Sequence, residues 1–454
     1  MKLPQEFLQK MQDTLGQEFS DFLQSYSKPR TAGLRTNRLK ISSEELAKLI
    51  PFVEEDIPWC YDGFYYNEQE VRPAKHPYYY AGLYYIQEPS AMLPAELLDV
   101  QAGDMVLDLC AAPGGKSVQL AGRLGDGLIV VNDINPQRAK VLLKNIERYG
   151  VINAVVLNET PERIASVFGK FFDKILVDAP CSGEGMFHKD PDMAKEWSEQ
   201  EVHKYVQWQA DILKLVPELL LPGGEIVYST CTFSREENEK QVENFVMANK
   251  SFEIIETRRL WPHRVKGEGH FAAKIKSHET GAGVNHKYCH KQSLSADARQ
   301  ALADFSQQVW GNKDLWQKWI PDGGNIIERS GHVLWEKSCL PPLKGLKVLR
   351  SGWLLGTVEK GRFYPSQAFA MGMDLNAVKA AVQCLELSAK SESDRYAVIR
   401  YLRGETIQEE GKLWPRGWHL VTVDGFPLGW GKGGGYSLKN EYPPGWRWQD
   451  RDER

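Results

Sequence analysis

Two cysteines stand in short runs of small and polar residues that suit nucleophilic chemistry. The first run is Asp178-Ala179-Pro180-Cys181-Ser182-Gly183-Glu184-Gly185, and the second is Tyr228-Ser229-Thr230-Cys231-Thr232. A single free cysteine is more often a buried apolar filler. Two thiols in such similar settings favour a reactive pair. One reaction that needs a thiolate is methylation of cytosine: when the thiolate adds to carbon 6 of the base, carbon 5 becomes able to take a methyl group from a sulfonium.

The same chemistry needs a group that activates the base and a group that takes up a proton. A carboxyl group near ring nitrogen 3 holds or protonates the base as charge develops, and Asp178 is suitably placed for this. Cys181 or a bound water is available to remove the proton from carbon 5. The spacing alone does not say which of Cys181 and Cys231 attacks.

A third run, Asp108-Leu109-Cys110-Ala111-Ala112-Pro113-Gly114-Gly115-Lys116-Ser117, predicts a ligand-binding turn. Its small residues let backbone N–H groups and a helix N-terminus approach a ligand closely. The run has neither the glycine spacing of a phosphate loop nor three spaced glycines for a dinucleotide, so a nucleoside without pyrophosphate fits better. Asp133 is placed to accept hydrogen bonds from ribose hydroxyls. The alternative is that Asp133 only caps the following helix.

These runs need a scaffold that brings them together, and the chain from Val106 to about Lys250 predicts one. Short β-rich stretches alternate with helices, which is typical of an open parallel sheet covered on both faces. The carboxyl ends of parallel strands share one edge, so Asp108, Asp133, Asp178 and Cys231 are expected to converge there. We predict strands at 105–109, 128–132, 154–157, 174–177 and 225–228, the last after a turn at 222–224, and a helix from Pro136 that stops at Gly150.

The flanking segments predict accessory parts around a Rossmann-like α/β core at 96–278. Residues 1–95 are expected to form an α+β domain that binds RNA, with an amphipathic helix within Met1–Ser25 packed on that same domain. Residues 279–343 are expected to form a connector followed by a helix at 295–319. Residues 344–454 are rich in turns and tryptophan and predict a β-rich region.

Composition limits the class of protein further. The formal net charge of −4 shows no general basic excess, and no apolar run reaches the roughly 18 residues that span a bilayer. Seven cysteines without framework spacing favour a reducing compartment. We therefore expect a cytoplasmic protein, as a monomer, without a membrane segment.

One segment has a local excess of basic residues that is either a phosphate-binding surface or a solvated loop. Between residues 258 and 291 the only acids that we expect to face the basic side chains are Glu268 and Glu279. His278, His286, Cys289 and His290 in the same region match no common zinc spacing, so no metal is expected. The basic residues are Arg258, Arg259, Arg264, Lys266, Lys274, Lys276, Lys287 and Lys291.

The three runs, in their order along the chain from Asp108 to Thr232, resemble the Sun/Fmu-type family of RNA cytosine-5 methyltransferases. The resemblance extends from about residue 30 to residue 278. It is supported by three further stretches, namely Arg35-Thr36-Asn37-Arg38-Leu39-Lys40, Gln87-Glu88-Pro89-Ser90, and Pro262-His263 with Gly267-Glu268-Gly269-His270-Phe271.

The resemblance implies a role for each site residue and S-adenosylmethionine as the methyl donor. Cys231 is then the nucleophile, Cys181 assists release of the product, and Lys116 and Asp178 reach towards the reacting centre. One position departs from the family, since Asn158-Glu159-Thr160 stands where an aspartate often meets the adenine; Asn158 or Thr160 is the candidate for that contact. The implied cofactor-binding residues are Cys110, Ala111, Ala112, Pro113, Gly114, Gly115, Lys116, Asp133, Arg138 and Asp178.

The C-terminal region resembles the PUA-type RNA-binding barrel of the bacterial subgroup that modifies 16S ribosomal RNA. The matching stretches are 401–405, 425–430 and 439–443. Interleaved aromatic and basic side chains suit RNA, although a β-rich stabilising module is the alternative. Ribosomal RNA is the expected substrate, with transfer RNA or a non-catalytic role in ribosome assembly as alternatives. The two thiols disfavour the non-catalytic role, and an amino-group methyltransferase is disfavoured because its Pro-Pro-Tyr type loop is replaced by 178–181.

Overall fold

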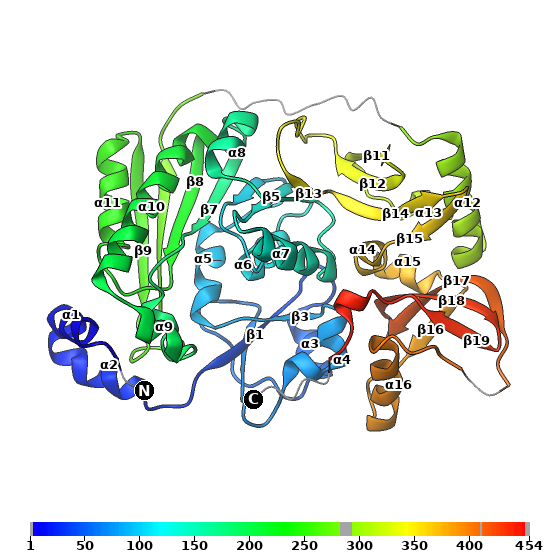
Figure 1. The fold of residues 1–454 in the computed structure, drawn as a ribbon, viewed down its shortest axis with the longest axis horizontal. Helices are drawn as coiled ribbons and strands as arrows, with labels where there is room; N and C mark the ends of the chain where they lie inside the picture. The colour runs from blue at the N-terminus through cyan, green and yellow to red at the C-terminus, as the bar shows by residue number, and fades with distance from the viewer. Residues whose placement is uncertain (1–2, 282–292, 409–410, 450–454) are drawn as a thin grey trace.

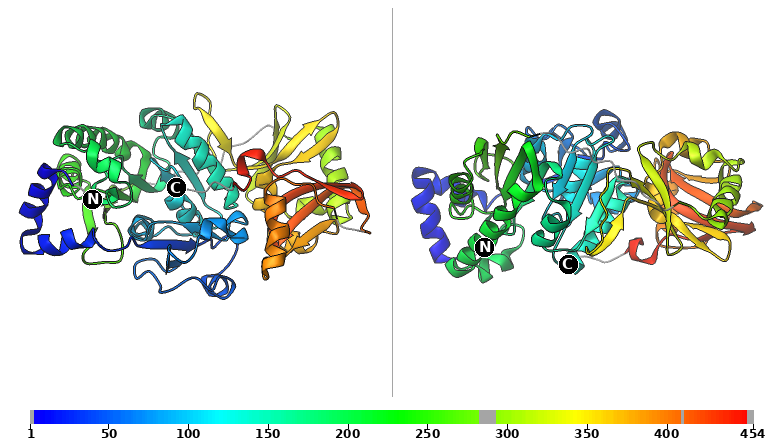
Figure 2. Two further views of the ribbon diagram at one scale, coloured as in Figure 1. Left: turned by 60° about the horizontal axis from the view of Figure 1, so that its bottom comes forward. Right: turned by 90° about the horizontal axis from the view of Figure 1, so that it is seen from above.

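A computed structural model describes residues 3–281, 293–408 and 411–449. The N-terminal helices lie at one end of the molecule, an eight-stranded sheet with its helices forms the middle, and two smaller sheets lie at the other end (Figures 1 and 2). Among the described residues, no helix combines the length and the apolar character that a membrane crossing requires.

The central sheet has the strand order β13-β6-β5-β4-β7-β8-β10-β9. Strands β6, β5, β4, β7 and β8 run parallel, as the sequence predicts. At the edges, β13 pairs antiparallel with β6, β10 pairs antiparallel with β8, and β9 pairs antiparallel with β10. The elements of this part are α5 (Leu93–Leu98), β4 (Met105–Asp108), α6 (Gly115–Ala121), β5 (Leu128–Asn132), α7 (Pro136–Arg148), β6 (Ala154–Leu157), α8 (Pro161–Phe168), β7 (Phe172–Asp178), α9 (Pro191–Glu196), α10 (Glu199–Leu219), β8 (Leu220–Thr230), α11 (Glu239–Ala248), β9 (Phe252–Leu260) and β10 (His270–Ser277).

Successive residues of the central strands point into different cores, which makes a three-layer α/β/α arrangement. Val106 packs with Leu142 of α7 on one face of the sheet, whereas Leu107 packs with Leu213 of α10 on the other. Because β4 lies between β5 and β7, the strand order reverses beside it. Ligands gather at the carboxyl ends of the strands at such a point, which is where the glycine turn begins.

Strand β8 starts earlier than the sequence indicates. The expected turn at 222–224 lies inside the strand, where the pairing with β7 shifts between Phe172–Leu220 and Lys174–Glu225. Gly223 has a φ of 76°, which a residue with a side chain rarely adopts. The residues predicted as a turn are therefore a bulge that interrupts the pairing without ending the strand.

The N-terminal helices pack on the central domain, and the expectation that they pack on their own domain is wrong. Phe7 and Phe22 share a core with Phe187 and Trp197, which follow the first cysteine run. The segment breaks at Gly16 into two helices. A three-stranded antiparallel sheet, β2-β1-β3, follows them. The elements are α1 (Gln5–Leu15), α2 (Phe19–Ser25), β1 (Ala32–Thr36), α3 (Ser43–Leu49), β2 (Gly63–Tyr66), α4 (Pro77–Tyr80) and β3 (Tyr84–Ile86).

The C-terminal region contains two four-stranded sheets, and β13 leaves them to pair with β6 of the central sheet. The helix expected at 295–319 ends at Trp310, because Gly311 takes a left-handed conformation. The elements are α12 (Ala296–Trp310), α13 (Leu315–Lys318), β11 (Gly324–Arg329), β12 (His332–Lys337), β13 (Val348–Ser351), β14 (Trp353–Glu359), β15 (Arg362–Pro365), α14 (Gln367–Met371), α15 (Leu375–Lys379), β16 (Cys384–Leu387), α16 (Glu392–Leu402), β17 (Trp414–Val423), β18 (Phe426–Gly435) and β19 (Ser437–Asn440).

Candidate active site

The two cysteines of the polar runs meet at the carboxyl end of the central sheet. Cys181 follows β7, Cys231 follows β8, and their Sγ atoms lie 3.5 Å apart. Both side chains are partly exposed, so neither thiol is sealed in an apolar core. The contact with Cys231, together with burial, raises the pKa of the Cys181 thiol well above its usual range. Cys181 is therefore a protonated thiol while Cys231 stands beside it.

An ion pair joins the glycine turn to the strand that carries Cys181. Lys116, in the first turn of α6, places its Nζ 2.7 Å from Oδ2 of Asp178. Ser229 Oγ donates a hydrogen bond of 2.8 Å to Oδ1 of the same carboxylate. Burial opposes it, but the charge of Lys116 and the contact with His270 hold the pKa of the Asp178 carboxyl well below its usual range. Asp178 is therefore an ionised hydrogen-bond acceptor at the edge of the site.

His270 belongs to this site, and the sequence indicated no role for it. Its Nε2 lies 3.6 Å from Oδ1 of Asp178, and its side chain is only 3% exposed. Neither ring nitrogen has a hydrogen-bond partner among the described residues. Burial, and then the charge of Lys116, lower the pKa of His270, whereas the neighbouring Asp178 carboxylate opposes them. His270 lies at the start of β10, opposite the end of β8, and the sequence alone does not show that these two strands pair.

The glycine turn is held from three sides. Arg138 Nη2 donates to the carbonyl of Ala112 over 2.6 Å, and Asn145 Nδ2 donates to that of Pro113 over 2.8 Å. From the N-terminal domain, the buried Arg35 donates to the carbonyl of Gly115 over 2.9 Å. The backbone of the turn is therefore fixed before any ligand arrives, with Gly114 at a φ of 110°.

Two acidic residues near this turn have different surroundings. Asp108 ends β4 near Asp133 and Asp178, and its fully buried side chain accepts a hydrogen bond of 2.6 Å from Ser117. Burial raises the pKa of Asp108 to about 7. Asp133 accepts from the backbone N–H of Asn135 through Oδ1, while its Oδ2 lies 3.4 Å from Arg138 Nη2. Through Oδ1, Asp133 thus holds the backbone at the start of α7, while its Oδ2 lies beside Arg138 at the site.

The residues at the open adenine position are engaged within the protein. Asn158 donates both amide hydrogens, to the carbonyls of Asp133 and Ile134, and accepts from Lys347 Nζ. Thr160 precedes α8 and makes no side-chain capping bond. Of the two candidates, Thr160 is the one whose side chain is left for a ligand contact.

The basic side chains of the 258–291 segment that the structure describes, which lie in β9, in β10 and between them, have acidic partners. These side chains meet acids from distant parts of the chain, so the expectation that they face only Glu268 and Glu279 is wrong. Lys274 and Lys276 both pair with Glu225, towards the end of β8 away from Cys231. The remaining pairs are Arg258–Glu256, Arg259–Glu239, Arg264–Glu18 and Lys266–Glu55.

Part of that segment lies outside the described residues, namely Lys287 and Lys291 with the candidate metal ligands His286, Cys289 and His290. His278 contacts Glu253. Within residues 3–281, 293–408 and 411–449, no group of three or more His, Cys, Asp or Glu side chains is placed to hold a metal ion.

Four family models match consecutive parts of the chain. Residues 95–276 match "16S rRNA methyltransferase RsmB/F", and residues 3–89 match the N-terminal domain of 16S rRNA methyltransferase RsmF. Residues 305–373 match the first C-terminal domain of the RsmF rRNA methyltransferase, and residues 388–448 match the methyltransferase RsmF PUA domain. The matches therefore cover the N-terminal helices, the three-stranded sheet, nearly all of the central sheet and most of the two four-stranded sheets.

Whole proteins of similar length are also similar to this chain. Ribosomal RNA small subunit methyltransferase F of Shewanella loihica is 31% identical, over 98% of this chain and 95% of its own. The protein of the same name from Vibrio campbellii is 30% identical, over 97% of each chain. Among solved structures, a methyltransferase homolog from Pyrococcus horikoshii is 29% identical with a TM-score of 0.55, over 60% of this chain and 95% of its own.

Proposed function

This chain belongs to the RsmF family of 16S rRNA methyltransferases, and on that premise we propose that it methylates carbon 5 of cytosine in 16S ribosomal RNA with Cys231 as the nucleophile. One observation carries the assignment of the site. The two thiols, 3.5 Å apart, share an edge of the sheet with the Lys116–Asp178 pair, which leads back to the glycine turn. Thiol, carboxylate and cofactor turn are the three parts that the reaction needs.

The residues present fit S-adenosylmethionine. When bound, this cofactor supplies a methyl group on a positively charged sulfur. The chain offers a turn of small residues at 110–115, the N-terminus of α6, and the Asp133 carboxylate for ribose hydroxyls. Arg138 and Arg35 hold the turn by its carbonyl oxygens, so their part in binding is to keep its shape.

Cys231 starts the reaction by adding to carbon 6 of the base. A bond forms between its sulfur and carbon 6, and the electron pair of the ring double bond moves to carbon 5. Carbon 5 would then form a bond to the methyl group while the bond from the methyl group to the cofactor sulfur breaks, and that sulfur would leave as a neutral thioether. Asp178 enters the reaction ionised, so it accepts hydrogen bonds from the base and does not begin as an acid. Lys116 keeps it in that state.

Cys181 completes the reaction by removing the proton from carbon 5. The C–H electron pair then re-forms the ring double bond, and the bond from carbon 6 to Cys231 breaks to return the thiolate. Contact with Cys231 is the largest cause of the high pKa of Cys181. Once Cys231 is bonded to the base it carries no charge, so Cys181 ionises more easily at the step that needs it.

Transfer RNA is the second candidate substrate, and bisulfite sequencing separates the two. We expect a strain lacking this chain to lose 5-methylcytosine at one or more 16S rRNA positions, and wild-type protein to restore it. Cys231→Ala protein, produced at the same level, is the control and restores nothing. Loss of methylation in transfer RNA alone would reject the ribosomal substrate, and unchanged methylation in both RNAs would reject the enzyme.

A further inference from the structure

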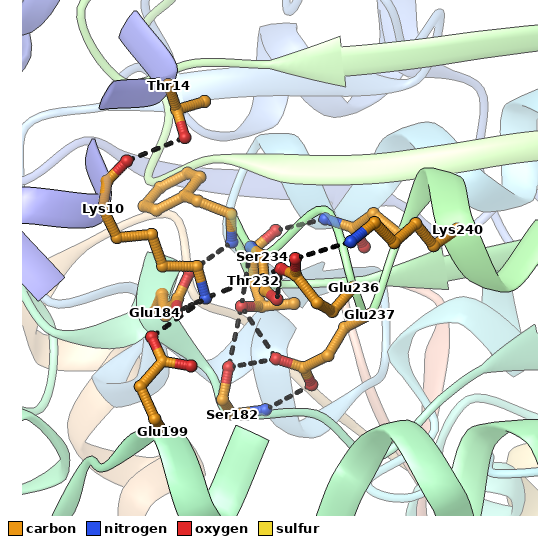
Figure 3. Close-up of polar contacts among 12 residues, drawn as sticks. Lys10, Thr14, Ser182, Glu184, Glu199, Thr232, Ser234, Glu236, Glu237 and Lys240 are labelled. Carbon is orange, nitrogen blue, oxygen red and sulfur yellow. Dashed lines mark hydrogen bonds and ion pairs between the residues drawn. The ribbon is translucent and has the colours of Figure 1, made fainter. Parts of the chain in front are cut away.

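The buried carboxylate of Glu237 connects the loops that carry the two thiols. Glu237 Oε2 accepts from the backbone N–H of Ser182 over 2.9 Å and from Gln209 Nε2 over 3.0 Å. Its Oε1 accepts from Ser182 Oγ over 2.5 Å and from Thr232 Oγ1 over 3.4 Å (Figure 3). Glu237 is fully buried. Ser182 follows Cys181 and Thr232 follows Cys231, so this one side chain touches the neighbours of both cysteines.

The loop of Cys231 has supports that do not involve Glu237. Asn238 accepts from Thr230 Oγ1 and donates to the carbonyl of Thr232, so it holds the residues on either side of Cys231. The carbonyl of Cys231 also accepts from the backbone N–H of Gly185 over 2.8 Å. The main chain at Cys231 therefore stays in place without the Glu237 carboxylate.

The start of the other loop depends on Glu237 to a greater degree. Both the N–H and the hydroxyl of Ser182, the residue next to Cys181, bond to its carboxylate. The other acid of this loop, Glu184, acts further along, where it accepts from the backbone N–H of Phe233 and pairs with Lys10 of α1 at 3.5 Å (Figure 3). Glu184 thus fixes the far end of the loop. Beside Cys181, Glu237 holds Ser182 on one side and Gln209 holds the carbonyl of Pro180 on the other.

We propose that Glu237 is a positioning residue for Cys181, which keeps the second thiol within reach of the base after Cys231 has reacted. This inference rests on the proposed function, because it assigns the resolving step to Cys181. Removing the carboxylate takes away both bonds from Ser182 to Glu237 and leaves its 2.8 Å hydroxyl contact with Thr232, so the adjoining thiol is less firmly placed. Asn238 and Gly185 still hold Cys231. The expected defect is therefore slow release of the RNA with normal attack.

The test compares Glu237→Ala with Glu237→Gln and with Glu236→Ala in the full-length protein. With RNA substrate and S-adenosylmethionine, we expect Glu237→Ala to form the covalent adduct within about threefold of the wild-type rate and to release it about tenfold more slowly, so that a slow band accumulates on a denaturing gel. Glu237→Gln restores release, because its amide oxygen accepts the two N–H groups and its NH₂ donates to the hydroxyls of Ser182 and Thr232.

Glu236 is the matched control, since it is the preceding acid and pairs with Lys240 at the surface. Its alanine variant is expected to behave as wild type. Equal slowing of attack and release in Glu237→Ala, or release as fast as in Glu236→Ala, would overturn the proposal.

A variant in the other loop keeps the test usable if Glu237→Ala does not fold. Ser182→Ala removes one of the two bonds to Glu237 and should slow release in the same direction by a smaller factor; unchanged release in this variant also counts against the proposal. Failure of the wild-type protein to methylate RNA would instead reject the proposed function, which separates the two outcomes.

Discussion

Lys116 Nζ and Asp178 Oδ2 lie 2.7 Å apart, and this pair spans the two halves of the site. Lys116 belongs to the helix that follows the glycine turn, and Asp178 ends the strand that leads to Cys181. A change on the cofactor side therefore alters the charge state of the carboxylate on the base side.

The two cysteines are expected to fail in different ways when they are replaced. Cys231→Ala removes the nucleophile and abolishes both methylation and covalent adduct. Cys181→Ala leaves attack intact but removes the group that takes the carbon 5 proton, so a covalent RNA adduct accumulates on a denaturing gel. Cys339→Ala, far from both loops in the sequence, is the control and should methylate normally. An adduct formed by Cys231→Ala would reverse the two roles.

Replacement of Lys116 is expected to make methylation activity fall at acidic pH. In the wild type its charge keeps the pKa of Asp178 low, so the carboxylate stays ionised throughout the working range. In Lys116→Met the charge that opposes burial most strongly is gone and the contact with His270 remains, so the pKa of Asp178 rises and activity falls as the pH drops through the new value. Between pH 8 and pH 6 the ratio of variant to wild-type rate should fall by about tenfold or more. Lys214→Met, at an exposed position on α10, is the control. A constant ratio across this range would contradict the assignment.

Arg35 is expected to support cofactor binding from outside the central domain. Arg35→Ala removes the hydrogen bond to the Gly115 carbonyl and loosens the turn. The Kd for S-adenosylmethionine, measured by calorimetry, should rise about tenfold, which corresponds to the loss of one charge-assisted hydrogen bond. Arg38→Ala changes a more exposed arginine of the same segment and should leave the Kd unchanged. Equal affinities for both variants would show that the turn holds its shape without Arg35.

Asp108 is expected to make the protein less stable as the pH rises. Its folded pKa is about 7, against about 3.9 for an unfolded aspartate, so the folded state prefers the protonated form. Stability from this group is full below pH 4 and is lost as the pH rises to 7. Nearby Asp178 and Asp133 strengthen the effect, and Lys116 weakens it.

Asp108→Asn removes that titration and should gain on the order of a few kcal/mol relative to wild type between pH 5 and pH 8. Urea unfolding at the two pH values measures the difference. Asp126→Asn, at an exposed site, is the control and should show the wild-type trend. A wild-type trend in Asp108→Asn as well would mean that another group causes the pH dependence.

The sequence by itself determined the elements whose patterns are local. Short apolar runs predicted strands at 128–132 and 154–157, and β5 and β6 have these same bounds. Asn135-Pro136 predicted the start of α7, and Gly150 predicted its end to within two residues. The order of the strands then required the two cysteines and the glycine turn to share one edge, because parallel strands all end on the same side of a sheet. Each of these inferences depends on residues close together in the chain.

The tertiary structure decided which side chains meet across long sequence separations. Arg264 meets Glu18 and Lys274 meets Glu225, so these two basic side chains have acidic partners from distant parts of the chain. In the same way Ser182 meets Glu237. Glu237 stands in a run of charged residues, and nothing in that run indicates this contact. Hydrophobic periodicity specifies which face of an element is buried, but the partner that covers this face follows only from packing all the elements together.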